Sequence, residues 1–174
     1  MMGTQFEHLG NLPVPSSEKV GELCQKCMEG VSLGELSPCF LKKHHSDWVD
    51  PLRELIKSRG FTTATWPSFN EEVADEYHSD MVILPIRGSS GWHKDYEPEN
   101  ALTLSWLIHC EPLISPELGD DYSSPPPTII VKYPQETVVG EIMMGDVFMF
   151  DHQYHHVWVS NWQCVLLQIP VRTT

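Results

Sequence analysis

The chain has 174 residues, the size of one globular domain, and 41% of them are apolar, which excludes an intrinsically disordered acidic protein. Its formal net charge of −13 makes duplex nucleic acid an unfavourable partner, because an acidic body repels phosphate. No stretch approaches the roughly 18 apolar residues of a membrane span and no secretory signal is recognisable, so we expect a cytoplasmic protein without a membrane segment. The cysteine count of five is odd, which favours free thiols in a reducing compartment.

The N-terminal part of the chain predicts helices. Residues 1–15 lack periodicity and are expected to form an arm. Three helices are predicted: one from Ser16 to Val31, one through Leu52, Leu55 and Ile56, and a short one at 69–72. Ser46 or Asp47 can cap the second helix, Pro51 suits its first turn, and Gly60 suits a C-terminal stop.

From residue 81 the pattern changes to short apolar runs separated by turn residues. The predicted strands are 81–84, 101–108, 128–131, 137–142, 147–150, 157–159 and 165–169. This series is typical of a sandwich, barrel or jelly roll. We therefore expect one mainly β domain over residues 1–174. In it, residues 1–80 form a helical support and residues 81–171 form a jelly-roll core.

Histidines are unusually frequent and two groups of them suggest a metal site. His93 and Asp95 are two positions apart, so in an extended backbone their side chains leave the same face and can chelate a divalent cation. A third ligand can come from the cluster of His152, His155 and His156. Two histidines and one carboxylate on one side of a metal leave other coordination positions open, as in non-haem Fe(II) oxygenases.

The order of motifs after His93-x-Asp95 is more specific. Gly145-Asp146 leads into an apolar strand that ends at Phe150, and His155 is followed by Val157 and Val159. This order resembles the Fe(II)/2-oxoglutarate-dependent dioxygenases, whose core is a double-stranded β-helix, a form of jelly roll. The resemblance covers roughly residues 81–171.

The resemblance implies an Fe(II) centre and hydroxylation of a small molecule or an amino-acid side chain, with 2-oxoglutarate as cosubstrate. The implied metal ligands are His93, Asp95 and a distal histidine, for which His155 fits the family's H-x-V pattern best and His156 second. Trp92, Tyr96, Tyr154 and Trp158 flank these positions and are candidates to line a substrate pocket, although each also suits ordinary packing.

One departure from the family concerns the cosubstrate. Many members carry an Arg or Lys about ten residues beyond the distal histidine, which binds the far carboxylate of 2-oxoglutarate. Here that stretch reads Gln163-Cys164-Val165-Leu166 and contains no cation. The substitutes in this chain are Arg87, Arg172 and Lys132, with the two arginines favoured.

Other functions remain open from the sequence. The missing cation favours a cupin-like metal enzyme that does not use 2-oxoglutarate, and a jelly-roll binding module without catalysis would leave the histidines as packing residues. Cys24-x-x-Cys27 with Cys39 and His44 or His45 has the outline of a zinc site. However, the first two cysteines lie on the apolar stripe of a predicted helix, where a thiol packs as a small hydrophobe.

Overall fold

The computed structural model describes residues 6–14, 18–44, 47–67, 75–95, 98, 100–113 and 125–173. Its helices are α1 (Glu18–Met28), a short 3-10 helix (Asp47–Val49) and α2 (Asp50–Ser58). Its strands are β1 (Glu7–Asn11), β2 (Cys39–Lys42), β3 (Thr62–Thr63), β4 (Tyr77–Arg87), β5 (Leu102–Pro112), β6 (Thr128–Lys132), β7 (Thr137–Glu141), β8 (Asp146–Phe150), β9 (His156–Val159) and β10 (Trp162–Arg172). The short helix predicted at 69–72 lies outside the described residues.

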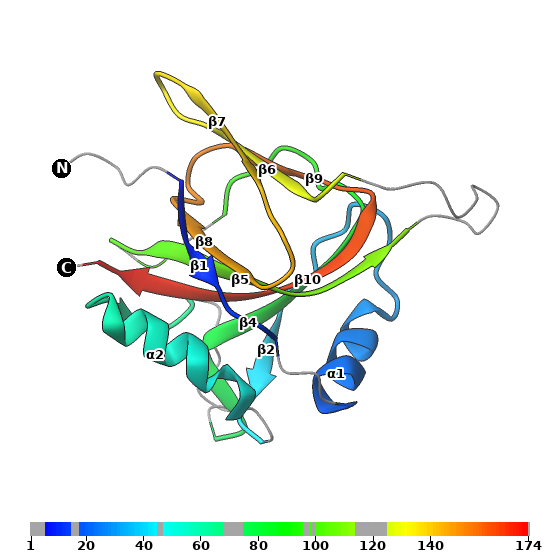
Figure 1. Cartoon of the computed structure of the whole chain (residues 1–174), viewed down its shortest axis with the longest axis vertical. Helices are drawn as coiled ribbons and strands as arrows, with labels where there is room; N and C mark the ends of the chain where they lie inside the picture. Colours follow the sequence, from blue (N-terminus) through cyan, green and yellow to red (C-terminus); the bar gives the residue numbers. More distant parts are fainter. Residues whose placement is uncertain are drawn as a thin grey trace.

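The strands form two antiparallel sheets that face each other (Figure 1). The larger sheet has the order β1-β8-β5-β10-β4-β2, with β3 paired to the end of β10. The smaller sheet has the order β7-β6-β9, and an isolated bridge between His93 and His156 extends it toward the segment that follows β4. The predicted jelly-roll fold is confirmed, since every strand expected after residue 81 is present.

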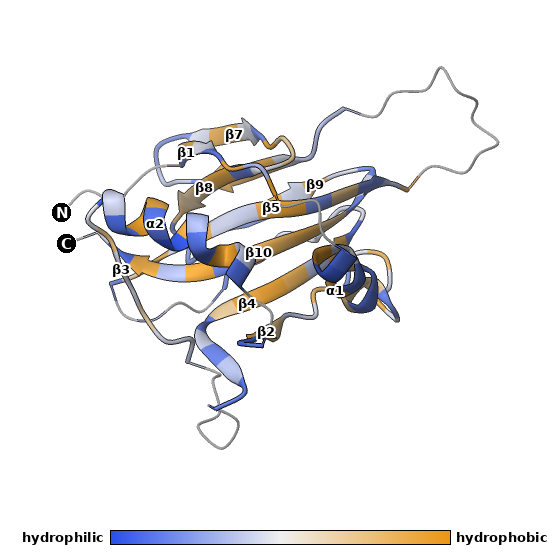
Figure 2. Ribbon diagram, turned by 60° about the horizontal axis from the view of Figure 1, so that its bottom comes forward, coloured by the Kyte–Doolittle hydropathy of each residue, from blue (hydrophilic) through white to orange (hydrophobic). Residues whose placement is uncertain are grey.

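Apolar side chains cover both faces of the larger sheet, so its central strands are buried on both sides. Along β10, Val165, Leu167 and Ile169 belong to a cluster that also contains residues of both helices. The alternate residues Cys164 and Leu166 belong to a second cluster between the two sheets. Figure 2 shows the resulting apolar colouring of β4, β5 and β10. We call the two sides the helix-covered face and the inner face.

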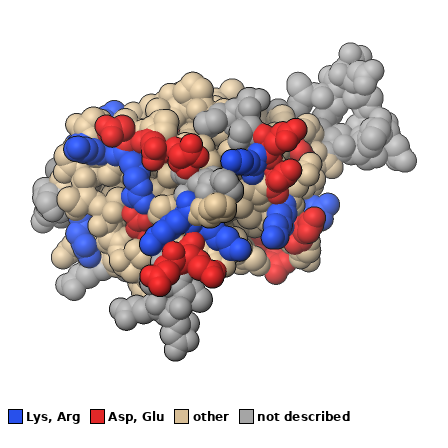
Figure 3. All heavy atoms as spheres, turned by 90° about the horizontal axis from the view of Figure 1, so that it is seen from below, with Lys and Arg blue, Asp and Glu red and all other residues tan. Residues whose placement is uncertain are grey.

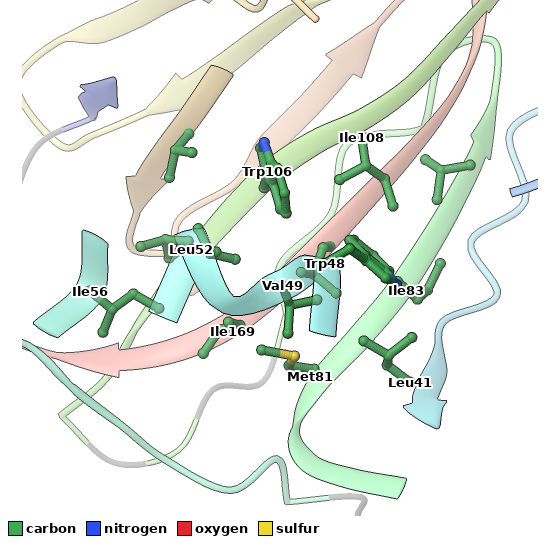
Figure 4. Packing of buried hydrophobic residues seen from close by; sticks show 14 of the residues in the cluster. Leu41, Trp48, Val49, Leu52, Ile56, Met81, Ile83, Trp106, Ile108 and Ile169 are labelled. Carbon is green, nitrogen blue, oxygen red and sulfur yellow. The ribbon is translucent and has the colours of Figure 1, made fainter. Parts of the chain in front are cut away.

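The helix-covered face is a continuous core (Figure 4). The ring of Trp106 is fully buried there, lies 6.0 Å from the ring of Trp48, and donates its indole N–H to the backbone carbonyl of Leu12. Helix α2 adds Leu52 and Ile56. Asp47 does not cap it as expected, because Asp47 begins the 3-10 helix and Val49 is the N-cap, without a side-chain hydrogen bond; Ser46 lies outside the described residues. Pro51 lies in the first turn of α2, and Gly60 follows its end at a φ of +74° that favours glycine.

The N-terminal segment differs from the expectation in two respects. Residues 7–11 do not form a free arm, because β1 pairs with β8 and completes one edge of the larger sheet. Helix α1 ends at Met28, three residues before the predicted Val31. Strands β2 and β3 were also not predicted. They are two to four residues long and are held by pairing with β4 and β10, so their own sequences carry little alternation.

The charged residues described on one face of the molecule are of both signs. On the face seen from below, Lys and Arg side chains alternate with Asp and Glu side chains (Figure 3). None of the helices in the described residues is long and apolar enough to cross a membrane.

Candidate metal centre

The segment after β4 is held against β9 by backbone hydrogen bonds. Gly88 turns the chain at a φ of +75°. The N–H of Ser90 then donates to the carbonyl of Trp158, and His93 and His156 exchange two hydrogen bonds of 3.0 Å each. The motif that contains His93 and Asp95 is therefore fixed beside the histidine cluster, although some sixty residues separate the two in sequence.

Three ligand-type side chains converge at this point. The ring nitrogens of His93 and His156 and a carboxylate oxygen of Asp95 all lie within 4.8 Å of one another. Nε2 of His156 is 3.2 Å and Nε2 of His93 is 3.7 Å from Oδ2 of Asp95. Among the described residues this is the one group of three or more histidine, cysteine, aspartate or glutamate side chains arranged to hold an ion.

The hydrogen bonds of the two imidazoles orient them for a cation. Nδ1 of His93 donates to the carbonyl of Gly91 at 2.7 Å, and Nδ1 of His156 donates to the carbonyl of Tyr154 at 2.8 Å. A carbonyl oxygen can only accept a hydrogen bond, so each neutral imidazole must carry its proton on Nδ1. The Nε2 atoms of His93 and His156 therefore present lone pairs toward Asp95. Converging acceptors need either a proton or a metal ion between them, so the donor set fits a divalent cation.

His152 holds the carboxylate of Asp95 in place through two hydrogen bonds, one from its side chain and one through its backbone. Its ring is buried, lies 4.0 Å from the ring of Phe150, and its Nδ1 donates to Oδ2 of Asp95 at 3.0 Å. Its backbone carbonyl also accepts the N–H of Asp95 at 2.8 Å. Burial lowers the pKa of His152 to about 4, so this imidazole is neutral at physiological pH. The sequence offered His152 only as one possible third ligand within the histidine cluster and did not predict this supporting contact with Asp95.

The electrostatics of Asp95 favour the ionised form that a metal requires. Partial burial by itself would raise the pKa of Asp95. The hydrogen bond from His152 and the neighbouring imidazole of His156 outweigh that effect and hold the pKa well below its usual range. Asp95 is therefore ionised at neutral pH, so a metal ion does not have to displace a proton bound to the carboxylate.

The structure groups His156, and not His155, with the predicted ligands His93 and Asp95. His155 is exposed, and its backbone carbonyl accepts the N–H of Lys132. The reason is the strand register. His156 pairs with Val131 and shares the inner face with buried Trp158, whereas its neighbour points to the other side. The H-x-V pattern that favoured His155 misplaced the inner face by one residue.

A narrow chamber of about 30 Å³ opens beside the three candidate ligands, between the sheets. Its wall is largely apolar, with Leu84, Phe148, Phe150 and Leu166 among the lining residues. The polar part of the wall beyond the histidines and Asp95 includes Ser105 and Gln168. These two are buried, and the side-chain amide of Gln168 donates to the hydroxyl of Ser105.

The three candidate cations do not line this chamber. Arg87 is exposed and its guanidinium lies 3.4 Å from the carbonyl of Val31, on the side of α1. Lys132 is exposed and places its ammonium 4.3 Å from the ring centre of Trp92. Arg172 lies at the far end of β10, where it pairs with Thr62 of β3.

The aromatic candidates divide in the same way. Trp158 lines the chamber, Trp92 is 48% exposed outside it, and Tyr154 packs against Tyr133 with ring centres 5.0 Å apart. Tyr96 lies outside the described residues. The zinc hypothesis named Cys24, Cys27 and Cys39 with His44 or His45. Among the described residues, these cysteines and His44 do not form a group that could hold an ion, and His45 lies outside the described residues.

Comparisons with known proteins support the fold. No protein-family model matches the chain, and no curated protein matches it. Among solved structures, a prolyl hydroxylase from Trichoplax adhaerens, in complex with a hypoxia-inducible factor peptide, is similar over 95% of this chain and 82% of its own. The TM-score of that match is 0.50 and the identity is 12%.

Two further similar structures fall just below that score. One is an oxidoreductase of the 2OG-Fe(II) oxygenase family from Burkholderia pseudomallei, with a TM-score of 0.49 and 8% identity over 97% of this chain and 84% of its own. The other is SnoK, a non-haem α-ketoglutarate-dependent carbocyclase of nogalamycin biosynthesis, with a TM-score of 0.49 and 11% identity over 96% and 79%. The match to the prolyl hydroxylase confirms the expected architecture, and this chain shares the double-stranded β-helix fold of that structure.

Proposed function

We propose that the protein is a non-haem Fe(II) oxygenase whose metal is held by His93, Asp95 and His156. The observation that carries this proposal is the convergence of two Nε2 lone pairs and one carboxylate oxygen within 4.8 Å, on the fold that oxygenases use. Two imidazoles and one carboxylate on one side of Fe(II) leave the remaining positions for other ligands. Bound iron would supply the redox chemistry that activates dioxygen.

The residues of this chain prepare the site in three ways. Backbone carbonyls fix the tautomers of His93 and His156, His152 holds the carboxylate of Asp95, and the apolar inner face excludes bulk water from one side. The opposite side is open, because the side chains of His93 and Asp95 are 26% and 41% exposed. A substrate can therefore approach the metal from solvent.

That open side borders Trp92 and Lys132, which form a cation–π pair next to His93. We place the oxidised group, part of a small molecule or of an amino-acid side chain, on this side of the metal. The resemblance also implies 2-oxoglutarate, but the residues do not fit this cosubstrate as they fit the metal. No arginine or lysine among the described residues lines the chamber.

A second candidate is therefore a metal enzyme of the same fold that does not use 2-oxoglutarate, and the chamber wall favours it. A binding module without a metal is disfavoured, because converging lone pairs serve no packing purpose.

The proposal is tested by anaerobic titration of the purified protein with Fe(II) against a colorimetric chelator. We expect one ion per chain in the wild type and a large loss of affinity in His93→Ala and in His156→Ala. Dioxygen uptake by the iron-loaded wild type should exceed that of both variants. Wild-type affinity no higher than that of the two variants would overturn the proposal.

A further inference from the structure

The chamber beside the metal ligands has an unusual size for a cosubstrate site. Its volume of about 30 Å³ holds about two water molecules. 2-Oxoglutarate is a dicarboxylate with a five-carbon chain and is several times larger than a water molecule. Phe148 and Phe150, with ring centres 6.4 Å apart, stack within this part of the inner face. The enclosed part of the chamber is therefore smaller than such a ligand.

The charge of the chamber is also wrong for a dicarboxylate. A buried carboxylate without a cationic partner is strongly unfavourable. The described wall offers no lysine or arginine, and it already contains the carboxylate of Asp95. Beyond the histidines and Asp95, the buried polar groups of the wall include the hydroxyl of Ser105 and the neutral amide of Gln168, which donates to that hydroxyl. An incoming anion would meet an apolar wall.

One position shows the substitution directly. Leu166 is ten residues beyond His156, on the inner face of β10, where the family resemblance expects the carboxylate-binding cation. Its side chain is 3% exposed and lines the chamber. Strand β10 continues inward-facing with Gln168, so no shift of register by two residues brings a cation to this face.

We propose that the metal centre does not take 2-oxoglutarate, and that the chamber admits only a neutral ligand of about the size of water or dioxygen. This inference rests on the proposed function for the metal itself and specifies what binds beside it. The organic substrate then reaches the metal only from the solvent side. The protein is in this respect distinct from the 2-oxoglutarate enzymes whose fold it shares.

The test uses the iron-loaded wild-type protein under argon, with iron content measured beforehand. Addition of millimolar 2-oxoglutarate should produce no metal-to-ligand charge-transfer band. Nitric oxide, a small neutral probe for the dioxygen position, should produce an iron-nitrosyl electron paramagnetic resonance signal that 2-oxoglutarate does not alter. A saturable charge-transfer band, or a nitrosyl signal changed by 2-oxoglutarate, would overturn the inference.

Failure of the metal site would be recognised separately, because iron content is measured first. In that case isothermal titration of the metal-free protein with 2-oxoglutarate still decides the point. Heat of specific binding would contradict the inference, and its absence would support it.

Two variants at one position sharpen the result. Leu166→Arg adds the missing cation on the inner face and, where it folds and binds iron, should gain a charge-transfer band with 2-oxoglutarate. Leu166→Ala enlarges the chamber without adding charge and should remain without the band. A band in Leu166→Ala equal to that in Leu166→Arg would contradict the role assigned to charge.

Discussion

The two faces of the larger sheet are built from the same strands but serve different ends. On the helix-covered face, alternate residues of β4, β5 and β10 pack against α1 and α2 in a continuous core. On the inner face, the other residues leave a chamber of about 30 Å³ beside the three side chains of the proposed metal site. The comparison teaches that stability and chemistry are assigned to opposite sides of one sheet.

The largest effects on stability are expected at two adjacent residues of β10, Leu166 and Leu167, which lie on opposite faces of the larger sheet. Leu167 is fully buried on the helix-covered face, so Leu167→Ala should reduce the free energy of unfolding by about 2–5 kcal/mol. Leu166 already borders open space, so Leu166→Ala should fall at the low end of this range or below it. Urea denaturation of both variants measures the difference. Equal losses would show that the inner face is packed as tightly as the other.

Removal of the carboxylate should affect the metal and leave the core intact. Because loss of a supporting residue typically weakens metal binding about 10–100-fold, loss of the ligand Asp95 in Asp95→Asn should weaken it more than about 100-fold. Anaerobic chelator competition measures the affinity. Glu111→Gln, a substitution of an exposed carboxylate paired with His109, is the matched control and should bind iron normally. Near-wild-type affinity in Asp95→Asn would remove Asp95 from the site.

His152 should have a smaller effect of the same kind. His152→Ala removes the hydrogen bond to Asp95 and should weaken Fe(II) binding about 10–100-fold. His152→Asn places an amide donor near the position of Nδ1 and should recover part of the loss. The control is His109→Ala on β5, outside the site. If both His152 variants bind iron like the wild type, His152 does not position the carboxylate.

The smallest effect is expected from the ion pair that joins α2 to β4. Arg53 donates to both carboxylate oxygens of Asp80, at 2.9 and 3.1 Å. Burial opposes ionisation of Asp80, but the hydrogen bonds and charge of Arg53 outweigh it and lower the pKa of Asp80. Since the folded pKa lies below the unfolded value of about 3.9, the pair stabilises fully above that pH and less as the pH falls through the folded pKa.

Asp80→Asn should therefore reduce the free energy of unfolding by about 1 kcal/mol at neutral pH. The difference between the wild type and the variant should shrink below about pH 4. Thermal or urea unfolding at a series of pH values measures it. A difference that grows as the pH falls would contradict the assigned direction.

Much of the architecture was predictable because alternation and turn residues mark strands that are packed on at least one side. Leu104, Trp106 and Ile108 alternate along the predicted strand 101–108 and so leave one face of it, and all three join the helix-covered core. Strand β1 was not predictable, because only Leu9 of its residues is buried and its pairing with β8 depends on tertiary structure. Because β1 and β8 are far apart in the sequence, no local pattern indicates that they pair.

The candidate site was predictable in part: two of its three residues could be selected from the sequence, but the third could not. The spacing of His93 and Asp95 sufficed to select them, since a shared face follows from backbone geometry. The choice between His155 and His156 depended on the register of β9 against β6, which adjacent histidines do not reveal. The only sequence feature that pointed to the small, uncharged chamber was the absence of Arg or Lys from the stretch 163–166. The volume of the chamber depends on how side chains far apart in sequence pack together.

The central claim is that His156, and not its neighbour, completes a metal site with His93 and Asp95. The most direct measurement compares anaerobic Fe(II) affinity in the wild type, His156→Ala and His155→Ala, with folding checked by circular dichroism. We predict that His156→Ala loses more than about 100-fold in affinity, while His155→Ala, which changes an exposed side chain, binds like the wild type. A loss in His155→Ala with normal binding in His156→Ala would contradict it.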